Sequence, residues 1–308
     1  MKILVTPASF KQGAAGPVFE KLKAFAGELV FNPQPKPLSE DELIPLLEGC
    51  IGCIAGLDPF SRKVIESTNT LKVISRYGAG VDNVDLQAAR EKNITVCSTP
   101  GVNSRAVAEL AFGMMLCLAR NLPFLDRRTK EGKWDRAIGT ELHKKTLGIL
   151  GLGYTGKEVA KRAAGFSMNI LSYDPCMDFE YAQNNRVFPV GFDELIKESD
   201  FLSLHLPLKE DTVNIISRDV MRKMKKGAVI INTARGGLLD ETAACDLLQS
   251  GHLGGLALDV YETEPPVHSK LFELDNVIFT PHIAARTEEA TAAMAELSVE
   301  NLINALKD

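Results

Sequence analysis

The sequence lacks a hydrophobic run long enough to cross a bilayer. Its longest wholly apolar stretch, Leu110–Ala119, has ten residues, whereas a membrane-spanning helix needs roughly 20. The first residues, Met1–Pro7, contain too short an apolar segment for a signal peptide and are typical of a first strand. Lys and Arg form no dense block and the formal net charge is −5, so the charge does not favour a nucleic-acid partner. We expect a soluble, cytoplasmic, globular protein.

The sequence lacks a regular cysteine pattern, because its six cysteines are scattered along the chain. Cys50 and Cys53 form a CxxC, which is compatible with a redox or a zinc site. A redox CxxC opens a helix, whereas Cys53 enters an apolar run, and a zinc site needs a second ligand pair that the sequence does not supply. The prediction is therefore buried, unreactive thiols and no metal.

The length and composition indicate two domains. The chain has 308 residues, of which 45% are hydrophobic and 24% are charged, as in ordinary globular proteins. Residues 1–99 alternate between strand-like and helix-like pieces, and a capping box at Ser39–Glu42 begins one of the helices. Strands are predicted at Lys2–Thr6, Leu29–Phe31, Cys53–Gly56, Val73–Arg76 and Thr95–Cys97. This alternation predicts a complete α/β domain with a parallel sheet covered on both faces.

The middle of the chain differs in character. Residues 102–120 form a long helical pattern that is apolar almost all the way round, so this helix is expected to be buried on several sides. It could lie between two domains, or it could also form a subunit interface. Residues 121–145 are charged and irregular and contain the only tryptophan, Trp134. We expect an extended arm here and a homodimer built on residues 102–136.

A glycine-rich turn follows directly, between two strand-like runs. Thr146–Leu150 is a short apolar run, and Asn169–Tyr173 is a second one that ends in Asp174. Between them lie a helical pattern and the turn glycines Gly151, Gly153 and Gly156. Strand, glycine turn, helix, strand and acid is the order of a dinucleotide-binding unit.

Each part of this unit has a physical role. Gly151 permits the tight turn, Gly153 allows a pyrophosphate to approach the backbone, and Gly156 allows close packing of helix and strand. The free amides at the helix start attract the phosphates. Asp174 is placed to accept hydrogen bonds from an adenosine ribose, and its charge should repel the extra phosphate of NADP. We therefore predict that NAD is the cofactor.

Further strands are predicted after this unit, and polar residues stand at their ends. The strands are Phe201–Leu204, Ala228–Asn232, Gly255–Asp259 and Val277–Thr280. Because ligands bind beyond the carboxyl ends of parallel strands, the residues to consider are Pro207, Thr233-Ala234-Arg235, Asp259 and Pro281-His282, with Arg76–Gly80 at the corresponding edge of the first domain. The final helix, Thr287–Lys307, is expected to return to the first domain, which gives domains of 1–99 with 287–308 and of 100–286.

Arg235 and His282 could support hydride transfer. Such a reaction needs one group that binds the carboxylate or carbonyl of the substrate and another that moves a proton. Singly, each residue has a plainer interpretation: Arg235 as a surface arginine in a turn, His282 as a histidine at a strand end. Glu264 taken alone would be a solvated loop acid.

Taken together, six motifs over essentially the full chain resemble the D-isomer-specific 2-hydroxyacid dehydrogenases, the 3-phosphoglycerate dehydrogenase branch in particular. They are Arg76–Asp85, Gly151–Gly156 with Asp174, His205–Pro207, Asn232–Gly237, Asp259–Pro265 and Thr280–Ala284. The resemblance implies two doubly wound α/β domains with parallel sheets, one a flavodoxin-like substrate domain and the other a Rossmann NAD-binding domain, with a cleft between them.

The resemblance also implies site residues. The catalytic set is Arg235, Glu264 and His282, in which arginine grips the 2-oxo acid, histidine passes the proton and glutamate hydrogen-bonds the histidine. NAD is bound by Gly151, Gly153, Tyr154, Thr155, Gly156, Asp174, Pro207, Thr233, Ala234 and Asp259, the last of which holds the nicotinamide carboxamide. The substrate is bound by Arg76, which is available for a phosphate, and by the backbone amides of Gly78, Ala79 and Gly80.

The sequence departs from the family pattern in places, and several substrates stay open. Ala284 replaces a usual glycine, and Gly56–Phe60 lacks the basic residue that phosphoglycerate enzymes often carry. We rank 3-phosphoglycerate first, then glyoxylate or hydroxypyruvate, then larger apolar 2-oxo acids. An NAD-sensing binding protein similar to the corepressors of this fold is the alternative from another class. Because the sequence ends at Asp308, a serine-sensing regulatory domain is not expected.

Overall fold

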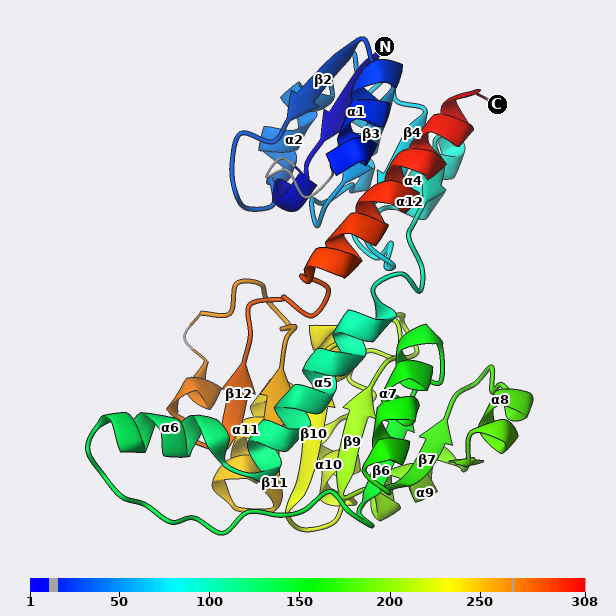
Figure 1. Cartoon of the computed structure of the whole chain (residues 1–308). Helices are drawn as coiled ribbons and strands as arrows, with labels where there is room; N and C mark the ends of the chain where they lie inside the picture. Colours follow the sequence, from blue (N-terminus) through cyan, green and yellow to red (C-terminus); the bar gives the residue numbers. More distant parts are fainter. Residues whose placement is uncertain (11–15, 268, 308) are drawn as a thin grey trace. The chain divides into compact units, whose positions relative to one another are not determined.

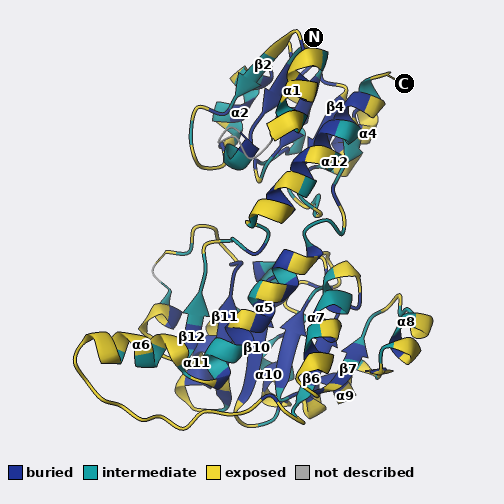
Figure 2. Cartoon of the chain, in the orientation of Figure 1, coloured by how far each residue is buried: buried dark blue, intermediate teal, exposed yellow. Residues whose placement is uncertain are grey.

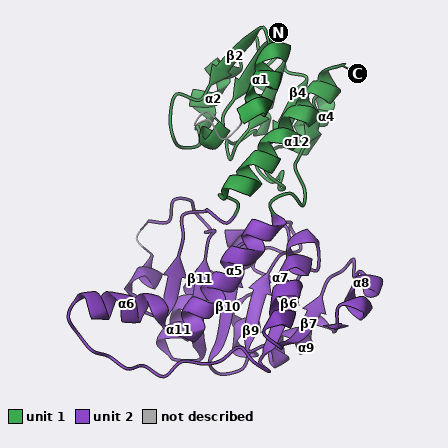
Figure 3. Cartoon of the chain, in the orientation of Figure 1, with its two compact units in different colours: residues 1–103, 285–308 green, residues 104–284 purple. Residues whose placement is uncertain are grey.

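The computed structural model describes residues 1–10, 16–267 and 269–307. The chain divides into two compact units, Met1–Asn103 with Ala285–Asp308 and Ser104–Ala284 (Figure 3). The sequence predicts boundaries at residues 99 and 287, which differ from these by a few residues. One reason is that Asn103 still contacts the first unit, since its Nδ2 lies 3.9 Å from the Met294 sulfur.

The first unit contains a five-stranded parallel sheet in the order β2-β1-β3-β4-β5 (Figure 1). Its strands are β1 (Lys2–Val5), β2 (Glu28–Phe31), β3 (Gly52–Ala55), β4 (Val73–Arg76) and β5 (Thr95–Cys97). This is the strand order of a flavodoxin-like doubly wound fold. The predicted α/β class is confirmed for this unit.

Helices cover this sheet, and the last helix of the chain is one of them. They are α1 (Gly16–Phe25), α2 (Glu40–Leu47), α3 (Arg62–Ser67), α4 (Leu86–Glu91) and α12 (Glu288–Lys307). The predicted capping box is present at the start of α2, where Ser39 donates from its backbone N and its Oγ to the Glu42 carboxylate, at 2.8 and 2.9 Å. α12 packs against α1 and the middle of the sheet, with Val299 and Leu302 fully buried in the shared core.

The second unit contains a seven-stranded parallel sheet in the order β12-β11-β10-β9-β6-β7-β8. Its strands are β6 (Thr146–Leu150), β7 (Asn169–Tyr173), β8 (Val187–Pro189), β9 (Phe201–Leu204), β10 (Ala228–Asn232), β11 (Leu253–Leu258) and β12 (Val277–Phe279). The order reverses between β6 and β9, which is the topological switch point of a Rossmann fold. The glycine turn follows β6 and therefore lies at that switch point.

Helices cover both faces of this sheet, and a hydrophobic core lies between the helices and the sheet on each face. α5 (Ser104–Ala119) and α7 (Tyr154–Gly165) pack on one face, and α9 (Phe192–Glu198), α10 (Arg218–Arg222) and α11 (Glu241–Gln249) lie over the other (Figure 1). The central strands are buried almost without interruption (Figure 2). Near-continuous apolar strands are required because both faces are covered. α8 (Phe179–Asn184) contacts the edge strand β8.

The segment after α5 is only partly the irregular arm that the sequence predicts. Residues 122–130 form a helix, α6 (Leu122–Lys130), with Pro123 in its first turn and with Arg127, Arg128 and Lys130 in its last. Basic residues stabilise a helix at that end, and this local signal was missed because the segment has few apolar residues. Residues 133–142 have no helix or strand, and Trp134 is 85% exposed.

No single helix in the described ranges is long and apolar enough to span a membrane. Taken together, α5 and α6 have the length and composition of a membrane span, but the two helices are bent by 63° where they join.

The packing of α12 can be tested through Leu302. Its side chain is fully buried, and a Cβ at Gly52 would lie 2.9 Å from it, so the strand leaves just enough room for the helix. Leu302→Ala should lower the free energy of unfolding by about 2–5 kcal/mol, because it leaves a cavity. Glu296→Ala, on the exposed side of α12, should change it by less than about 0.5 kcal/mol. Denaturant titration measures both, and equal stability of the two variants would contradict this packing.

Candidate functional site

The glycine turn after β6 requires glycine at two positions for different reasons. Gly151 has φ +100°, and a Cβ there would lie 2.7 Å from the His205 carbonyl oxygen. A Cβ on Gly156 would lie 2.1 Å from the Gly151 carbonyl oxygen, so only glycine allows α7 to pack onto the turn. A Cβ on Gly153 would meet nothing within 4 Å. The open space is therefore at the one glycine expected to face a pyrophosphate, which fits a dinucleotide.

Asp174 follows β7 and is tied directly to this turn. Its carboxylate accepts a hydrogen bond from the backbone N of Leu152 at 2.6 Å and another from the backbone N of Cys176 at 2.7 Å. The acid and the glycine turn are thus held together, although 22 residues separate Asp174 from Leu152.

Two residues beside the glycines are also predicted to bind the cofactor. Tyr154 is 67% exposed and Thr155 is half-buried.

The end of β10 presents an unsatisfied hydroxyl. Thr233 is 7% exposed, and its Oγ1 has no hydrogen-bond partner among the described residues. A buried hydroxyl without a partner is costly, so such a group indicates a ligand or an ordered water. The neighbouring Ala234 is held by a hydrogen bond from its backbone N to Asn232 Oδ1 at 3.1 Å. Pro207, after β9, is exposed. These residues fit the predicted cofactor set.

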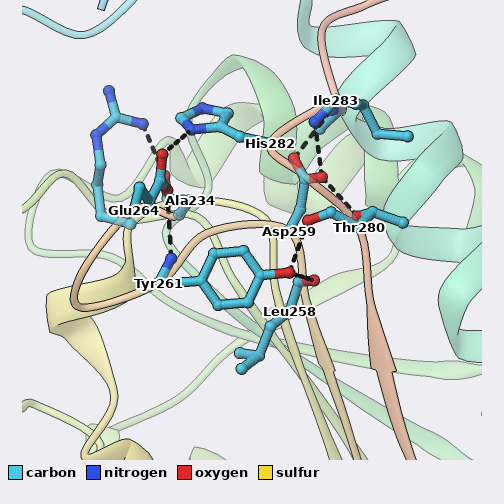
Figure 4. Close-up of polar contacts among 10 residues, drawn as sticks. Ala234, Leu258, Asp259, Tyr261, Glu264, Thr280, His282 and Ile283 are labelled. Carbon is cyan, nitrogen blue, oxygen red and sulfur yellow. Dashed lines mark hydrogen bonds and ion pairs between the residues drawn. The ribbon is translucent and has the colours of Figure 1, made fainter. Parts of the chain in front are cut away.

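Two predicted catalytic residues meet within this unit. His282 Nδ1 lies 2.8 Å from Glu264 Oε2, and the other carboxylate oxygen of Glu264 accepts a hydrogen bond from the Tyr261 backbone N at 3.3 Å (Figure 4). The side chains of His282 and Glu264 are 29% and 34% exposed, so a substrate can reach them. With Nδ1 engaged by the carboxylate, Nε2 is the ring nitrogen left for proton transfer.

Asp259 determines how His282 is presented. Its carboxylate is fully buried and accepts hydrogen bonds from Thr280 Oγ1 at 2.6 Å and Ile283 N at 2.8 Å (Figure 4). It also accepts one from Ala284 N at 2.9 Å. These bonds hold the turn in which His282 has φ +51°, a conformation unfavourable for a residue with a Cβ. Oδ2 accepts only one of these three bonds, and a carboxylate oxygen can accept more than one. That Asp259 also holds a nicotinamide carboxamide stays a prediction.

Tyr261 and Gly236 bring the remaining parts together. The Tyr261 hydroxyl donates to the Thr280 carbonyl oxygen at 2.7 Å, and burial together with the Asp259 charge raises the pKa of Tyr261 to about 12. It therefore stays a donor at neutral pH. A Cβ on Gly236 would lie 1.9 Å from the Tyr261 backbone carbon. Only glycine allows the turn that carries Arg235 to lie against this loop, and the Arg235 Nη1 donates to the Ala234 carbonyl oxygen at 2.6 Å.

A reciprocal contact that the sequence did not reveal supports the same loop. The Glu262 backbone N donates to Glu241 Oε1 at 2.7 Å, and the Glu241 backbone N lies 3.3 Å from Glu262 Oε1. Burial and the neighbouring acids raise the pKa of Glu241. The loop that carries Glu264 is thus attached to the first turn of α11. The two glycines after Arg235 could have signalled close packing, but no local pattern predicts the Glu241–Glu262 pair.

In the first unit, the residues predicted to bind the substrate are largely occupied by the chain itself. Arg76 is 3% exposed and donates to the backbone oxygens of Ala55, Gly56 and Gly80. The Gly78 amide donates to Thr99 Oγ1 at 3.0 Å. These contacts contradict the expectation of an available guanidinium at Arg76 and of an uncommitted amide at Gly78. Ala79, by contrast, is exposed.

Other titratable groups have structural surroundings. Burial lowers the pKa of His205 to about 4, so this histidine is neutral at pH 7 and lies 2.8 Å from Ser203 Oγ. Cys50 and Cys53 are buried as predicted, and desolvation raises the pKa of both thiols, whereas Cys176 is exposed. Within the described ranges, no three His, Cys, Asp or Glu side chains are grouped so that they could hold a metal ion.

The fold and the site define the class of this protein. The strand order, the glycine turn at the switch point and the acid after β7 form a dinucleotide-binding α/β unit, and a His–Glu pair stands at the same sheet edge. Residues 112–284 match the family model described as "D-isomer specific 2-hydroxyacid dehydrogenase, NAD binding domain". The chain belongs to the D-isomer-specific 2-hydroxyacid dehydrogenase family, and its second unit contains the NAD-binding domain of that family.

Individual relatives agree with this assignment. The chain is 48% identical over 250 residues to a D-3-phosphoglycerate dehydrogenase of Methanocaldococcus jannaschii, covering 80% of this chain and 48% of the relative. It is 44% identical over 278 residues to a hydroxypyruvate reductase of Thermotoga maritima, covering 87% and 89%. A glyoxylate reductase structure from Paecilomyes thermophila has a TM-score of 0.89 at 32% identity and covers 100% and 96%. The chain thus spans about half the length of the phosphoglycerate dehydrogenase that it matches.

The unsatisfied hydroxyl of Thr233 gives a test of cofactor fit. Thr233→Val keeps the shape and removes the hydroxyl, so NADH should bind roughly 3- to 10-fold more weakly while thermal stability without cofactor is unchanged or higher. Thr70→Val is the control, because Thr70 Oγ1 already donates to the Cys50 carbonyl oxygen at 2.8 Å. That variant should lose stability and keep NADH affinity. Calorimetric titration and thermal melts distinguish the two, and unchanged NADH affinity in Thr233→Val would contradict the assignment.

Proposed function

We propose that this protein is an NAD-dependent dehydrogenase that interconverts a D-2-hydroxy acid and its 2-oxo acid. The observation that carries the proposal is the 2.8 Å contact between His282 Nδ1 and Glu264, in the same unit as the glycine turn. A histidine oriented by a carboxylate is suited to moving a proton at neutral pH. The family and the relatives named above support the proposal.

The chain's own residues divide the work as follows. Arg235 offers a planar set of donors that matches a carboxylate and orients the 2-oxo acid. His282 Nε2 donates a proton to the oxygen of the keto group, and the contact of Glu264 with Nδ1 fixes the orientation of the ring. Bound NADH supplies the hydride. Asp259 holds the turn that presents His282, and it remains a candidate for binding the nicotinamide carboxamide. Ala79 and Gly80 are the substrate-binding candidates of the first unit that stay in the proposal.

The substrate we rank first is 3-phosphoglycerate. The M. jannaschii relative, which is 48% identical to this chain, is named a D-3-phosphoglycerate dehydrogenase. Hydroxypyruvate and glyoxylate follow, because the T. maritima relative and the P. thermophila structure carry those names.

A substrate panel tests the proposed activity. Purified protein with NADH should reduce one or more of phosphohydroxypyruvate, hydroxypyruvate, glyoxylate and pyruvate, with NAD-linked oxidation of 3-phosphoglycerate as the reverse assay. The decrease in nicotinamide absorbance measures each rate. Tight NADH binding without turnover on any substrate would contradict the dehydrogenase and favour an NAD-sensing binding protein. A preference for the phosphorylated substrate over hydroxypyruvate decides whether phosphate is recognised.

His282→Ala tests the proton donor. A positioned general acid contributes roughly 10²–10⁴-fold to the rate, so kcat should fall by that order while NADH affinity changes less than about threefold. His143→Ala, at an exposed position, is the control and should keep full activity. Steady-state kinetics and NADH titration measure both properties. Retention of kcat near the wild-type value in His282→Ala would remove this histidine from the mechanism.

We also propose a homodimer built on residues 102–136. The support is apolar surface on that segment and just after it: Leu122 is 50%, Trp134 85% and Ile138 95% exposed. Large aromatic side chains are enriched at protein interfaces. Light scattering at micromolar concentration should give twice the monomer mass, and Trp134→Glu should weaken association at least tenfold. A monomeric mass for the wild-type protein would contradict the proposal.

A further inference from the structure

A salt bridge connects the segments on either side of Asp174. Lys157, in the first turn of α7, places its Nζ 2.5 Å from Asp178 Oδ2. The same Nζ lies 4.8 Å from the centre of the Tyr181 ring, a cation–π distance. The Tyr181 hydroxyl donates to the Lys157 carbonyl oxygen at 2.9 Å. Two contacts therefore direct the ammonium toward Asp178 and Tyr181, and the hydrogen bond to the Lys157 carbonyl oxygen holds Tyr181 beside it.

This arrangement is next to the acid that we propose binds the adenosine ribose. Lys157 follows Gly156 directly, and Asp178 lies four residues after Asp174. Asp174 itself accepts hydrogen bonds from both sides, from Leu152 in the glycine turn and from Cys176 in the segment that leads to Asp178. The contact between Lys157 and Asp178 thus bridges the same two segments as the hydrogen bonds of Asp174. The Lys157 side chain is 29% exposed and so is accessible from solvent.

The charges at this place are one cation and two acids. A lysine ammonium with three donors is a good phosphate ligand when it is available. Here Asp178 pairs with it, and that pairing lowers the pKa of Asp178, which is therefore ionised at neutral pH. Asp174 supplies a negative charge that repels a phosphate. Asp178 adds a second negative charge. It also forms an ion pair with Lys157, the one cation among Lys157, Asp174 and Asp178.

We propose that Asp178 is a second determinant of cofactor choice: by holding Lys157, it prevents this lysine from pairing with the 2′-phosphate of NADP. The inference rests on the proposed NAD site and extends it. A purely structural role for the pair would be to attach α8 to α7. The two roles can be separated, because Asp178 also caps α8 by accepting a hydrogen bond from the Tyr181 backbone N at 2.9 Å. Asparagine caps a helix as well as aspartate does, so Asp178→Asn removes the charge and keeps the cap.

The experiment compares dissociation constants of NADH and NADPH, followed by nicotinamide fluorescence at one fixed low ionic strength. Asp178→Asn should bind NADPH about 3- to 10-fold more tightly than wild type and NADH within about twofold, since a single charge-assisted contact to phosphate is gained. Asp174→Asn/Asp178→Asn should gain more than Asp174→Asn alone. Asp246→Asn, which breaks the Arg218–Asp246 pair elsewhere in the same unit, is the matched control and should change neither constant.

Lys157→Met decides between capture by lysine and a general charge effect. If Lys157 is the ligand, Asp178→Asn should give no gain in NADPH affinity when combined with Lys157→Met. An equal gain in both backgrounds, or no gain in either, would overturn the role of Asp178 in holding Lys157. Thermal melts check that Asp178→Asn remains folded. Failure of the wild-type protein to bind NADH would instead contradict the proposed cofactor site, so the two failures are distinguishable.

Discussion

All seven strands of the second unit run parallel, so their carboxyl ends meet at one edge of the sheet. This constraint brings together residues that are far apart in sequence: Gly151 after β6, Asp174 after β7, Thr233 after β10 and Thr280–His282 after β12. Backbone pairing of the strands sets their order, and the order sets which residues meet. The loops between them are then free to carry chemistry.

Close approach of backbone segments refines this edge into a site. Gly156 and Gly236 each lie where a Cβ would overlap a neighbouring backbone, so α7 packs onto the glycine turn and the Arg235 turn packs onto Tyr261. Asp259 adds an electrostatic restraint, since its buried carboxylate is stabilised by three hydrogen bonds from the turn around His282. A buried acid without such partners would be strongly destabilising. The unfavourable backbone angle of His282 is therefore maintained by the surrounding hydrogen bonds.

Basic side chains in the first unit and around α7 are also engaged by other groups of the chain. Arg76 is occupied by backbone oxygens and Lys157 by Asp178 and Tyr181. In both cases a basic side chain that could bind an anion is directed to another partner by the fold. Which cations remain available to a ligand is decided by tertiary contacts rather than by residue type.

The amino-acid sequence alone determined the regular framework and the residues at its edges. The bounds of β4, β6, β7, β9 and β10 agree with those predicted, because short apolar runs bounded by turn residues depend on neighbouring residues only. The roles of Gly151 and Gly156 were also predictable, since a positive φ and a close approach both require glycine. Tertiary structure decided the commitment of Arg76 and the Gly78 amide, the role of Asp259 behind His282, and the pairing of Lys157 with Asp178. These contacts join groups that are distant in sequence, so they exist only once the strand order has placed the segments side by side.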